Sequence, residues 1–308
     1  MRGRKMTAAA KPAAWLAVLG VAFAAVATGD EVYREAVQKW RQDREERLRA
    51  ESGWLTLAGL FWLEDGTSTI GTDPASDVVL PEGAGASRAG VIVFEGGQAT
   101  LRLDPGVGAR ASGQTLDGPR VMRSDESERP DVVELGPVSF YVIKRGDRYA
   151  VRVKDKNSRA RREFAGLRWY EVNEGYRVEA RWVSYPQPRP LQVPNVLGEI
   201  ATMPSPGYAE FELGGRTVRL DGVLEDPTSL ELFFILRDET SGKQTYGAGR
   251  FLYSDLPKQG LVVLDFNKAY NPPCAFTAYA TCPLPPKQNW LPVPVEAGEM
   301  AYTGPGGH

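Results

Sequence analysis

The sequence predicts a mainly β protein, and three observations indicate that class. Glycine and proline are abundant, at 33 and 23 of the 308 residues. Short apolar or β-branched runs recur between clusters of Gly, Pro, Asn and Asp, which is typical of strands joined by tight turns. Long repeats with helical spacing are nearly absent. We therefore expect an N-terminal helix, a β-sandwich, and then a larger antiparallel β domain that forms a barrel or a sandwich.

Residues 1–27 have the pattern of an export signal. A basic start is followed by the apolar residues 13–25, which are too few for a comfortable membrane span, and residues 25–27 are small enough for cleavage. We expect a periplasmic or secreted protein with no stable membrane insertion after cleavage; an uncleaved anchor is the alternative. Residues 28–308 hold 33 Lys and Arg against 39 Asp and Glu, a net charge of −6, which speaks against nucleic acid as a partner.

Residues 28–53 are expected to form the N-terminal helical segment. The helix is predicted from Glu31 to Ala50, with Asp30 as its N-cap and Ser52-Gly53 ending it. Its apolar stripe is sparse, and the remaining face is densely charged. The stripe consists of Val32, Tyr33, Ala36, Val37, Trp40 and Leu48. We expect this helix to cover one end of a β domain.

Residues 54–153 are predicted to form a β-sandwich, because short β-branched runs alternate there with turn residues. Their order resembles the forkhead-associated domain, a β-sandwich that binds phosphothreonine. Thr72 stands where that family has its phosphate-binding arginine, and Ala89 stands where a histidine would follow Ser87-Arg88. An arginine fork is what recognises a phosphate well, so the resemblance implies the shape without phosphopeptide binding.

Residues 154–308 are predicted to form the larger antiparallel β domain. A basic stretch at residues 154–162 reads as a solvated connection, and clean apolar/polar alternation begins at Tyr176. Six or more short strands with hairpin-length connections follow, up to Phe266. The glycines of Gly247-Ala248-Gly249 indicate a bulge or a close backbone approach, because no βαβ spacing surrounds them. Between Pro272 and Pro294 the prolines are too dense for a helix or a central strand.

The histidine count limits the chemistry. The single histidine is His308, the last residue. A Ser-His-Asp or Cys-His nucleophile is therefore excluded, and so are His-rich metal sites. A hard metal on Asp265 and Asn267 is disfavoured because one carboxylate is too few. We expect neither a metal nor a redox cofactor.

The candidate site lies within residues 244–299. Asp265 and Asn267 point to one face of a predicted strand. If other polar side chains converge on them, the pocket would hold a small polar ligand; these side chains are Tyr246, Arg250, Tyr270 and Asn271. Asp265 could then act as a general base if burial raised its pKa. The structural alternative is a partly buried salt bridge between Asp265 and Arg250, with the two amides holding backbone groups.

Two cysteines in an exported protein favour a disulfide. Cys274 and Cys282 have seven residues between them and are predicted to pair. The alternative is two separate thiols, one of them reactive, although no histidine could lower a thiol pKa here.

The densest motif runs from Leu264 to Pro286, with Thr245-Tyr246 and Gly249-Arg250 before it and residues 297–299 after it. Through this motif the chain resembles domain-of-unknown-function family 1684, which comprises bacterial and archaeal proteins. Trp290 departs from the arginine expected in relatives. Because the resemblance implies no activity, three readings stay open: a receptor for a small polar ligand, a hydrolase or lyase using Asp265 or Glu299 as base, and a structural scaffold.

Overall fold

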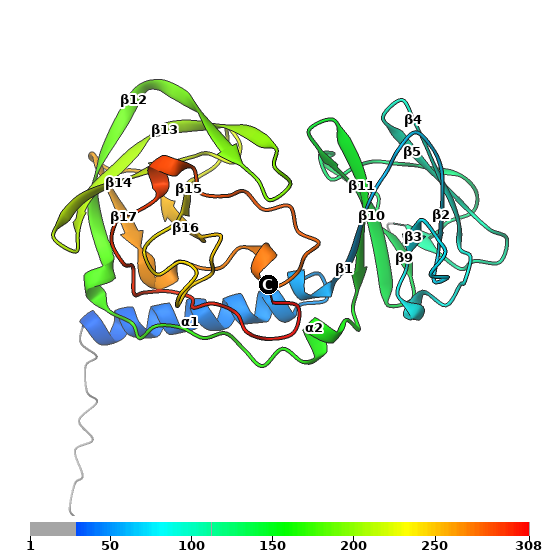
Figure 1. Ribbon diagram of the computed structural model, residues 1–308, viewed down its shortest axis with the longest axis horizontal. Helices are drawn as coiled ribbons and strands as arrows, with labels where there is room; N and C mark the ends of the chain where they lie inside the picture. Colours follow the sequence, from blue (N-terminus) through cyan, green and yellow to red (C-terminus); the bar gives the residue numbers. More distant parts are fainter. Residues whose placement is uncertain (1–28, 112, 308) are drawn as a thin grey trace, which may run out of the picture.

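The computed structural model describes residues 29–111 and 113–307, and it confirms a mainly β protein with one long N-terminal helix (Figure 1). Two lobes of β structure lie side by side, and α1 (Gly29–Arg49) runs beneath the C-terminal lobe toward the other. The predicted export signal, residues 1–27, lies outside the described residues. Within the described part, no helix is both long and apolar enough to cross a membrane.

Helix α1 has acidic residues in its first turn and basic residues in its last, an arrangement that the helix dipole favours. Its buried face differs from the predicted stripe. Val37 and Leu48 are buried, but so are Arg41 and Arg44, which the sequence assigns to the charged, solvated face. Val32, by contrast, is exposed. The helix buries cations because the loops beneath it supply carbonyl and carboxylate partners.

The N-terminal lobe is a sandwich of two sheets. One has the order β1-β11-β10-β9-β6-β7 and the other β3-β2-β4-β5-β8, and all pairs are antiparallel except β2 with β3. The first sheet contains β1 (Leu57–Trp62), β6 (Arg110–Ala111), β7 (Gln114–Thr115), β9 (Val133–Leu135), β10 (Val138–Arg145) and β11 (Arg148–Asp155). The second contains β2 (Gly66–Gly71), β3 (Val78–Val79), β4 (Gly90–Glu95), β5 (Gln98–Leu103) and β8 (Arg120–Met122). Ile70 and Leu101 of one sheet share a core with Val133 and Phe140 of the other. Likeness to the forkhead-associated domain stays a prediction, as do the domain boundaries.

The C-terminal lobe combines an open sheet of order β14-β13-β12-β17 with the hairpin β15-β16. Its strands are β12 (Arg177–Pro194), β13 (Ile200–Leu213), β14 (Arg216–Gly222), β15 (Glu231–Leu236), β16 (Arg250–Asp255) and β17 (Leu261–Asp265). A register shift between Ser184 and Arg189 accommodates prolines within the long β12. Leu220, Phe234 and Phe266 fill the core. Within the described residues no closed barrel forms, so the sheet-and-hairpin arrangement replaces the barrel alternative. Between the lobes, the predicted connection contains the short helix α2 (Arg159–Arg162).

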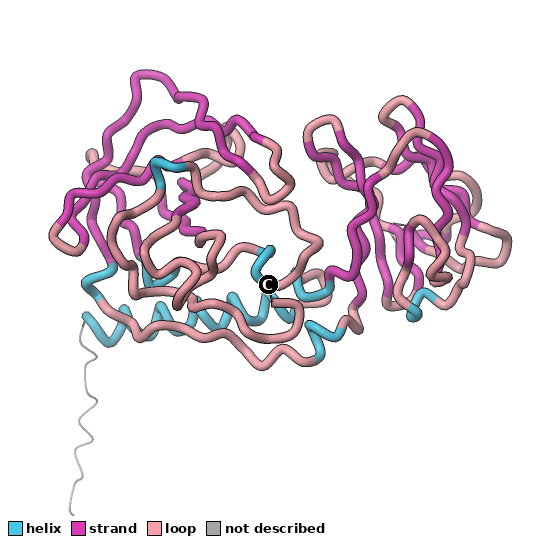
Figure 2. Tube along the Cα trace, in the orientation of Figure 1, coloured by secondary structure: helices cyan, strands magenta, loops and turns pink. Residues whose placement is uncertain are grey.

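After β17 the chain forms turns and isolated bridges instead of regular strands, as its prolines predict (Figure 2). Only single turns of 3-10 helix occur, at residues 266–268, 273–275 and 287–289. This loop passes along α1 and returns to the sheet. Gly298 allows one of its closest approaches: its φ is +81°, and a Cβ there would lie 2.4 Å from the carbonyl oxygen of Ala269. Gly249 likewise approaches Leu236, with a Cβ-to-oxygen distance of 2.5 Å.

We expect Gly298→Ala to destabilise the protein more than Gly215→Ala. Both residues have positive φ, +81° and +74°, but a Cβ at Gly215 meets nothing within 4 Å. Gly215→Ala should therefore cost only the left-handed backbone conformation, about 1–2 kcal/mol. Gly298→Ala should add a backbone clash of about 1–3 kcal/mol. Urea unfolding monitored by tryptophan fluorescence measures both, and equal losses would show that the loop relaxes freely.

Candidate functional site

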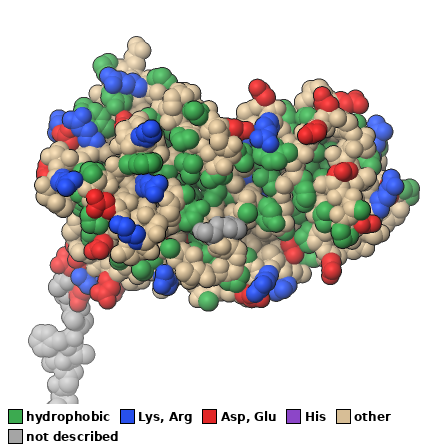
Figure 3. Space-filling model, viewed as in Figure 1, with side chains coloured by type: hydrophobic (Ala, Val, Ile, Leu, Met, Phe, Trp, Pro, Cys, Tyr) green, Lys and Arg blue, Asp and Glu red, His purple; other side chains and the backbone are tan. Residues whose placement is uncertain are grey.

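A cleft of about 1430 Å³ lies between the two lobes. Its walls come from the C-terminal half of α1, from β10 and β11, from the hairpin β15-β16, and from the loop after β17. Figure 3 shows hydrophobic side chains gathered on the surface between the lobes. The cleft is large enough for a small molecule, because ligand sites commonly measure about 300–1,000 Å³.

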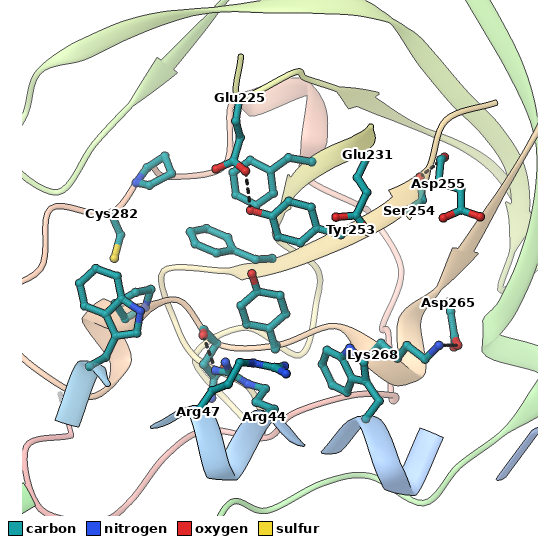
Figure 4. Close-up of a pocket in the computed structure, with 18 of the residues that line it drawn as sticks. Arg44, Arg47, Glu225, Glu231, Tyr253, Ser254, Asp255, Asp265, Lys268 and Cys282 are labelled. Carbon is teal, nitrogen blue, oxygen red and sulfur yellow. Dashed lines mark hydrogen bonds and ion pairs between the residues drawn. The ribbon is translucent and has the colours of Figure 1, made fainter. Parts of the chain in front are cut away.

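Aromatic rings form one wall of this cleft (Figure 4). The rings of Tyr253 and Tyr270 lie nearly parallel, 6.4 Å apart at 12°. Tyr253 also stacks on Phe233, at 4.8 Å and 20°. The Tyr253 hydroxyl donates to Glu225 Oε2 at 2.9 Å, and that carboxylate itself faces the cleft. Two phenols and a carboxylate therefore stand together beside the aromatic rings of this wall.

Both phenols keep their protons at neutral pH. Burial raises the pKa of Tyr270 to about 12, although the Arg44 guanidinium works against that shift. Burial also raises the pKa of Tyr253, and the neighbouring Tyr270 and Glu225 add to the effect. A buried neutral phenol can both donate and accept a hydrogen bond. The wall therefore offers hydroxyl groups to a polar ligand without placing a negative charge on them.

Beneath Tyr270 lies a buried network that ties α1 to the end of the chain. Arg44 Nε donates to Glu299 Oε2 at 2.7 Å, and Arg44 Nη2 donates to the Asn271 carbonyl oxygen at 2.9 Å. The same guanidinium lies 4.4 Å from the Tyr270 ring centroid. Asn271 Nδ2 donates to the other oxygen of Glu299 at 2.8 Å. Burial raises the pKa of Glu299, and Arg44 opposes that rise. The network holds the floor of the cleft in place.

Asp265 borders the cleft but is already engaged. Its Oδ1 accepts a hydrogen bond from Tyr33 of α1 at 2.7 Å, and its Oδ2 lies 3.4 Å from Lys268 Nζ. Asn267 is fully buried, and its amide joins the Asn173 backbone: Nδ2 donates to the carbonyl at 2.8 Å, while Oδ1 accepts from the amide at 2.9 Å. Asp265 and Asn267 are therefore near each other as predicted, but they join α1 to the sheet.

Arg250 does not belong to the cluster of polar residues predicted around Asp265. It is fully buried away from the cleft, and its guanidinium pairs with Asp238 at 2.9 Å and donates to the Val295 carbonyl at 2.9 Å. The expected Arg250–Asp265 salt bridge is wrong. Strand β16 pairs with β15 rather than with β17, and this pairing sets Arg250 opposite Leu236, two residues before Asp238. The geometry places Arg250 inside the core.

The structure therefore brings only part of the predicted set together. Asp265, Tyr270 and Asn271 border the cleft, while Tyr246, Arg250 and Asn267 do not. Tyr246 packs instead beside the two cysteines, where burial raises its pKa to about 12. Among the described residues no group of three or more His, Cys, Asp or Glu side chains gathers as a metal site would require.

Cys274 and Cys282 lie next to each other as free, buried thiols. The amide of Cys274 donates to Cys282 Sγ at 3.1 Å, and the amide of Cys282 donates to Cys274 Sγ at 3.4 Å. Hydrogen bonding between the thiols lowers the pKa of Cys274 and raises that of Cys282. Cys282 also borders the cleft (Figure 4). Proximity suits a disulfide, which stays a prediction.

Several cleft residues were missed by sequence reasoning. Arg44 belongs to a charged helix face, Glu225 to a turn, and Arg152 to a strand of the other lobe. Only Arg152 could have been noticed in the sequence, because it is a basic residue between two valines, Val151 and Val153, in a predicted strand. Nothing in the spacing along the chain could have grouped these three.

Residues 162–300 match the model of a family described as "Protein of unknown function (DUF1684)". One solved structure with similarity is the solution NMR structure of an uncharacterized protein of Haloarcula marismortui. The two chains are 33% identical, and the match covers 44% of this chain and 77% of that chain with a TM-score of 0.39. No curated protein matches the chain.

We expect Arg44→Met to cost about 3–5 kcal/mol of unfolding free energy, because it leaves the Glu299 carboxylate buried without its cation. The double variant Arg44→Met/Glu299→Gln should recover much of that loss. As a control, Arg34→Met on the same helix breaks the exposed Arg34–Glu174 pair and should cost far less stability than Arg44→Met. Chemical denaturation of the four proteins tests this, and an Arg44→Met loss as small as that of Arg34→Met would contradict it.

Proposed function

We propose that the protein, whose residues 162–300 match the DUF1684 family of unknown function, binds a small polar ligand in the cleft between its lobes. The observation that carries this proposal is the group of Tyr253, Tyr270 and Glu225 on an aromatic wall of a cleft of about 1430 Å³. Large apolar pockets with a few convergent polar groups are the usual form of small-molecule sites.

The polar groups on this wall suit a ligand with hydroxyl or amide groups. The Tyr253 hydroxyl donates its hydrogen bond to Glu225, so a lone pair on its oxygen can accept a hydrogen bond from a ligand. The free oxygen of Glu225 can accept a second one. Rings such as Phe233 and Phe251 would pack against the carbon skeleton of the ligand, since both also line the cleft.

The hydrolase or lyase reading has weaker support. A general base needs a free lone pair within reach of a substrate proton. Asp265 is held by Tyr33 and Lys268, and Glu299 is fully buried between Arg44 and Asn271. Freeing either carboxylate would require breaking contacts that fix α1 to the C-terminal lobe. The scaffold reading accounts for these contacts but leaves the cleft without a role.

Export of the protein, to the periplasm or beyond, is part of the same proposal. It is supported by the basic and apolar pattern of residues 1–27 and by the adjacent cysteine pair, which an oxidising compartment would convert into a disulfide.

To test the binding role, we would compare wild-type protein with Tyr253→Phe and Glu225→Gln. Mass spectrometry of solvent extracts would identify co-purified compounds, and thermal shift against amino acids, polyols and organic acids would find others. Wild type should bind a compound that raises its melting temperature. Each variant should bind that compound about two- to tenfold more weakly, since one hydrogen bond contributes about 0.5–1.5 kcal/mol.

Tyr185→Phe is the matched control for this experiment. Tyr185 donates to Asp221 at 2.8 Å, so it forms the same kind of tyrosine–carboxylate pair outside the cleft. Its replacement should leave binding unchanged. The proposal fails if no compound stabilises wild type in preference to Tyr253→Phe.

The cysteine pair makes a separate prediction. In protein purified from an oxidising compartment without reductant, unfolding should expose no thiol to alkylation, and reduction should then expose both Cys274 and Cys282. Intact mass after iodoacetamide treatment measures this. Two labelled thiols before reduction would show that Cys274 and Cys282 are not paired, and the predicted disulfide would then be wrong.

A further inference from the structure

The outer face of the six-stranded sheet in the N-terminal lobe carries a basic strip, of which Arg145 and Arg152 line the cleft. Val151 and Val153 of β11 point into the sandwich core, so Arg152 between them points the other way, toward the C-terminal lobe. Arg145 of β10 and Lys154 of β11 lie on the same face. These three side chains, Arg145, Arg152 and Lys154, are here called the basic strip.

Within this strip, Arg152 is buried without a counter-charge. Its residue is 2% exposed, no carboxylate of the described residues pairs with it, and its Nε has no hydrogen-bond partner. Its one hydrogen bond among the described residues is long: Nη2 donates to Thr281 Oγ1 at 3.4 Å. A buried charge without a partner lowers the stability of the folded protein. The fold tolerates that cost at the wall of a cleft.

The surroundings of Arg152 add positive charge. Arg145 Nε donates to the same Thr281 hydroxyl at 3.0 Å, although the rest of its guanidinium is paired with Asp125. Lys154 is close enough for Arg152 to help lower its pKa, after burial as the main cause. The Trp54 ring also lines the cleft, and the Arg152 guanidinium carbon lies over its face, 5.9 Å from the ring centroid.

We propose that Arg152, with Arg145 and the Thr281 hydroxyl, forms a subsite for an oxyanion, the carboxylate or phosphate group of the cleft ligand. The guanidinium fork matches either group, and its free Nε is a donor that such an oxygen would satisfy. This inference rests on the proposed ligand-binding role of the cleft and names the class of ligand as an anion.

The test uses inorganic phosphate and acetate as probes, at constant ionic strength set with sodium chloride. We expect phosphate, acetate or both to raise the melting temperature of the wild-type protein along a saturating curve. A response to acetate alone indicates a carboxylate ligand, and a response to phosphate alone indicates a phosphate ester. Arg152→Met should lose the saturable response and should be at least as stable as wild type without the probe, because it removes an unpaired buried charge at similar volume.

Two further variants serve as a control and as a second test of the subsite. Arg237→Met is the matched control, since Arg237 lies 5.0 Å from the Trp290 ring, forms no ion pair among the described residues, and lies outside the cleft. It should keep the full response. Arg145→Gln changes a side chain that is 28% exposed, so it should fold, and it should weaken the probe about tenfold or more.

The inference is overturned if neither probe gives a saturable response with wild type, or if Arg152→Met responds as wild type does. Tyr253→Phe separates this outcome from failure of the proposed function, because it removes no positive charge and should bind the probes normally. If wild type shows no response to the anions but still binds a compound that depends on Tyr253, the anion subsite is wrong and the proposed binding of an uncharged ligand stands. If wild type responds to the anions but no compound depends on Tyr253, the anion subsite stands and the role proposed for the aromatic wall is wrong.

Discussion

The buried pair of Arg44 and Glu299 is the contact on which the arrangement of the cleft depends. It joins two residues 255 positions apart and fixes the N-terminal helix against the end of the C-terminal loop. A buried ion pair contributes little net stability when its members are compared with apolar residues, but it penalises any arrangement that separates them. Because Asn271 and the Tyr270 ring pack on the same guanidinium, the position of the cleft floor follows from this one contact.

Three buried arginines show how a structural cation differs from a candidate binding group. Arg250 is sealed in the core with Asp238, and Arg44 is paired with Glu299, so each is neutralised within the protein. Arg152 is as deeply buried but has no carboxylate beside it, and it borders the cleft. A protein can retain such a charge where an external anion completes its coordination. Arg152 thus differs from Arg44 and Arg250 in having no carboxylate partner among the described residues, and it differs from Arg250 also in lining the cleft.

The cleft also extends beyond the family segment. Tyr253, Tyr270 and Glu299 lie within residues 162–300, whereas Arg44 belongs to α1 and Arg152 to β11. The aromatic wall therefore lies within residues 162–300, which match the family model. Arg44 and Arg152 come from residues that precede this segment.

The sequence by itself determined the features that depend on near neighbours along the chain: the β class, a helix predicted at residues 31–50 and found at 29–49, and the irregular path of the proline-rich loop. For Gly249 it left a bulge or a close backbone approach open, and the structure has the close approach. The features set by near neighbours follow from φ restriction, donor loss and side-chain alternation, which act over a few residues. Only the tertiary structure decided which polar residues meet. The pairing of β16 with β15 sent Arg250 to Asp238 and away from Asp265, and the docking of α1 placed Arg44 under Tyr270. Contacts between distant segments depend on strand pairing and on the pairing of buried charges, and no local spacing encodes either.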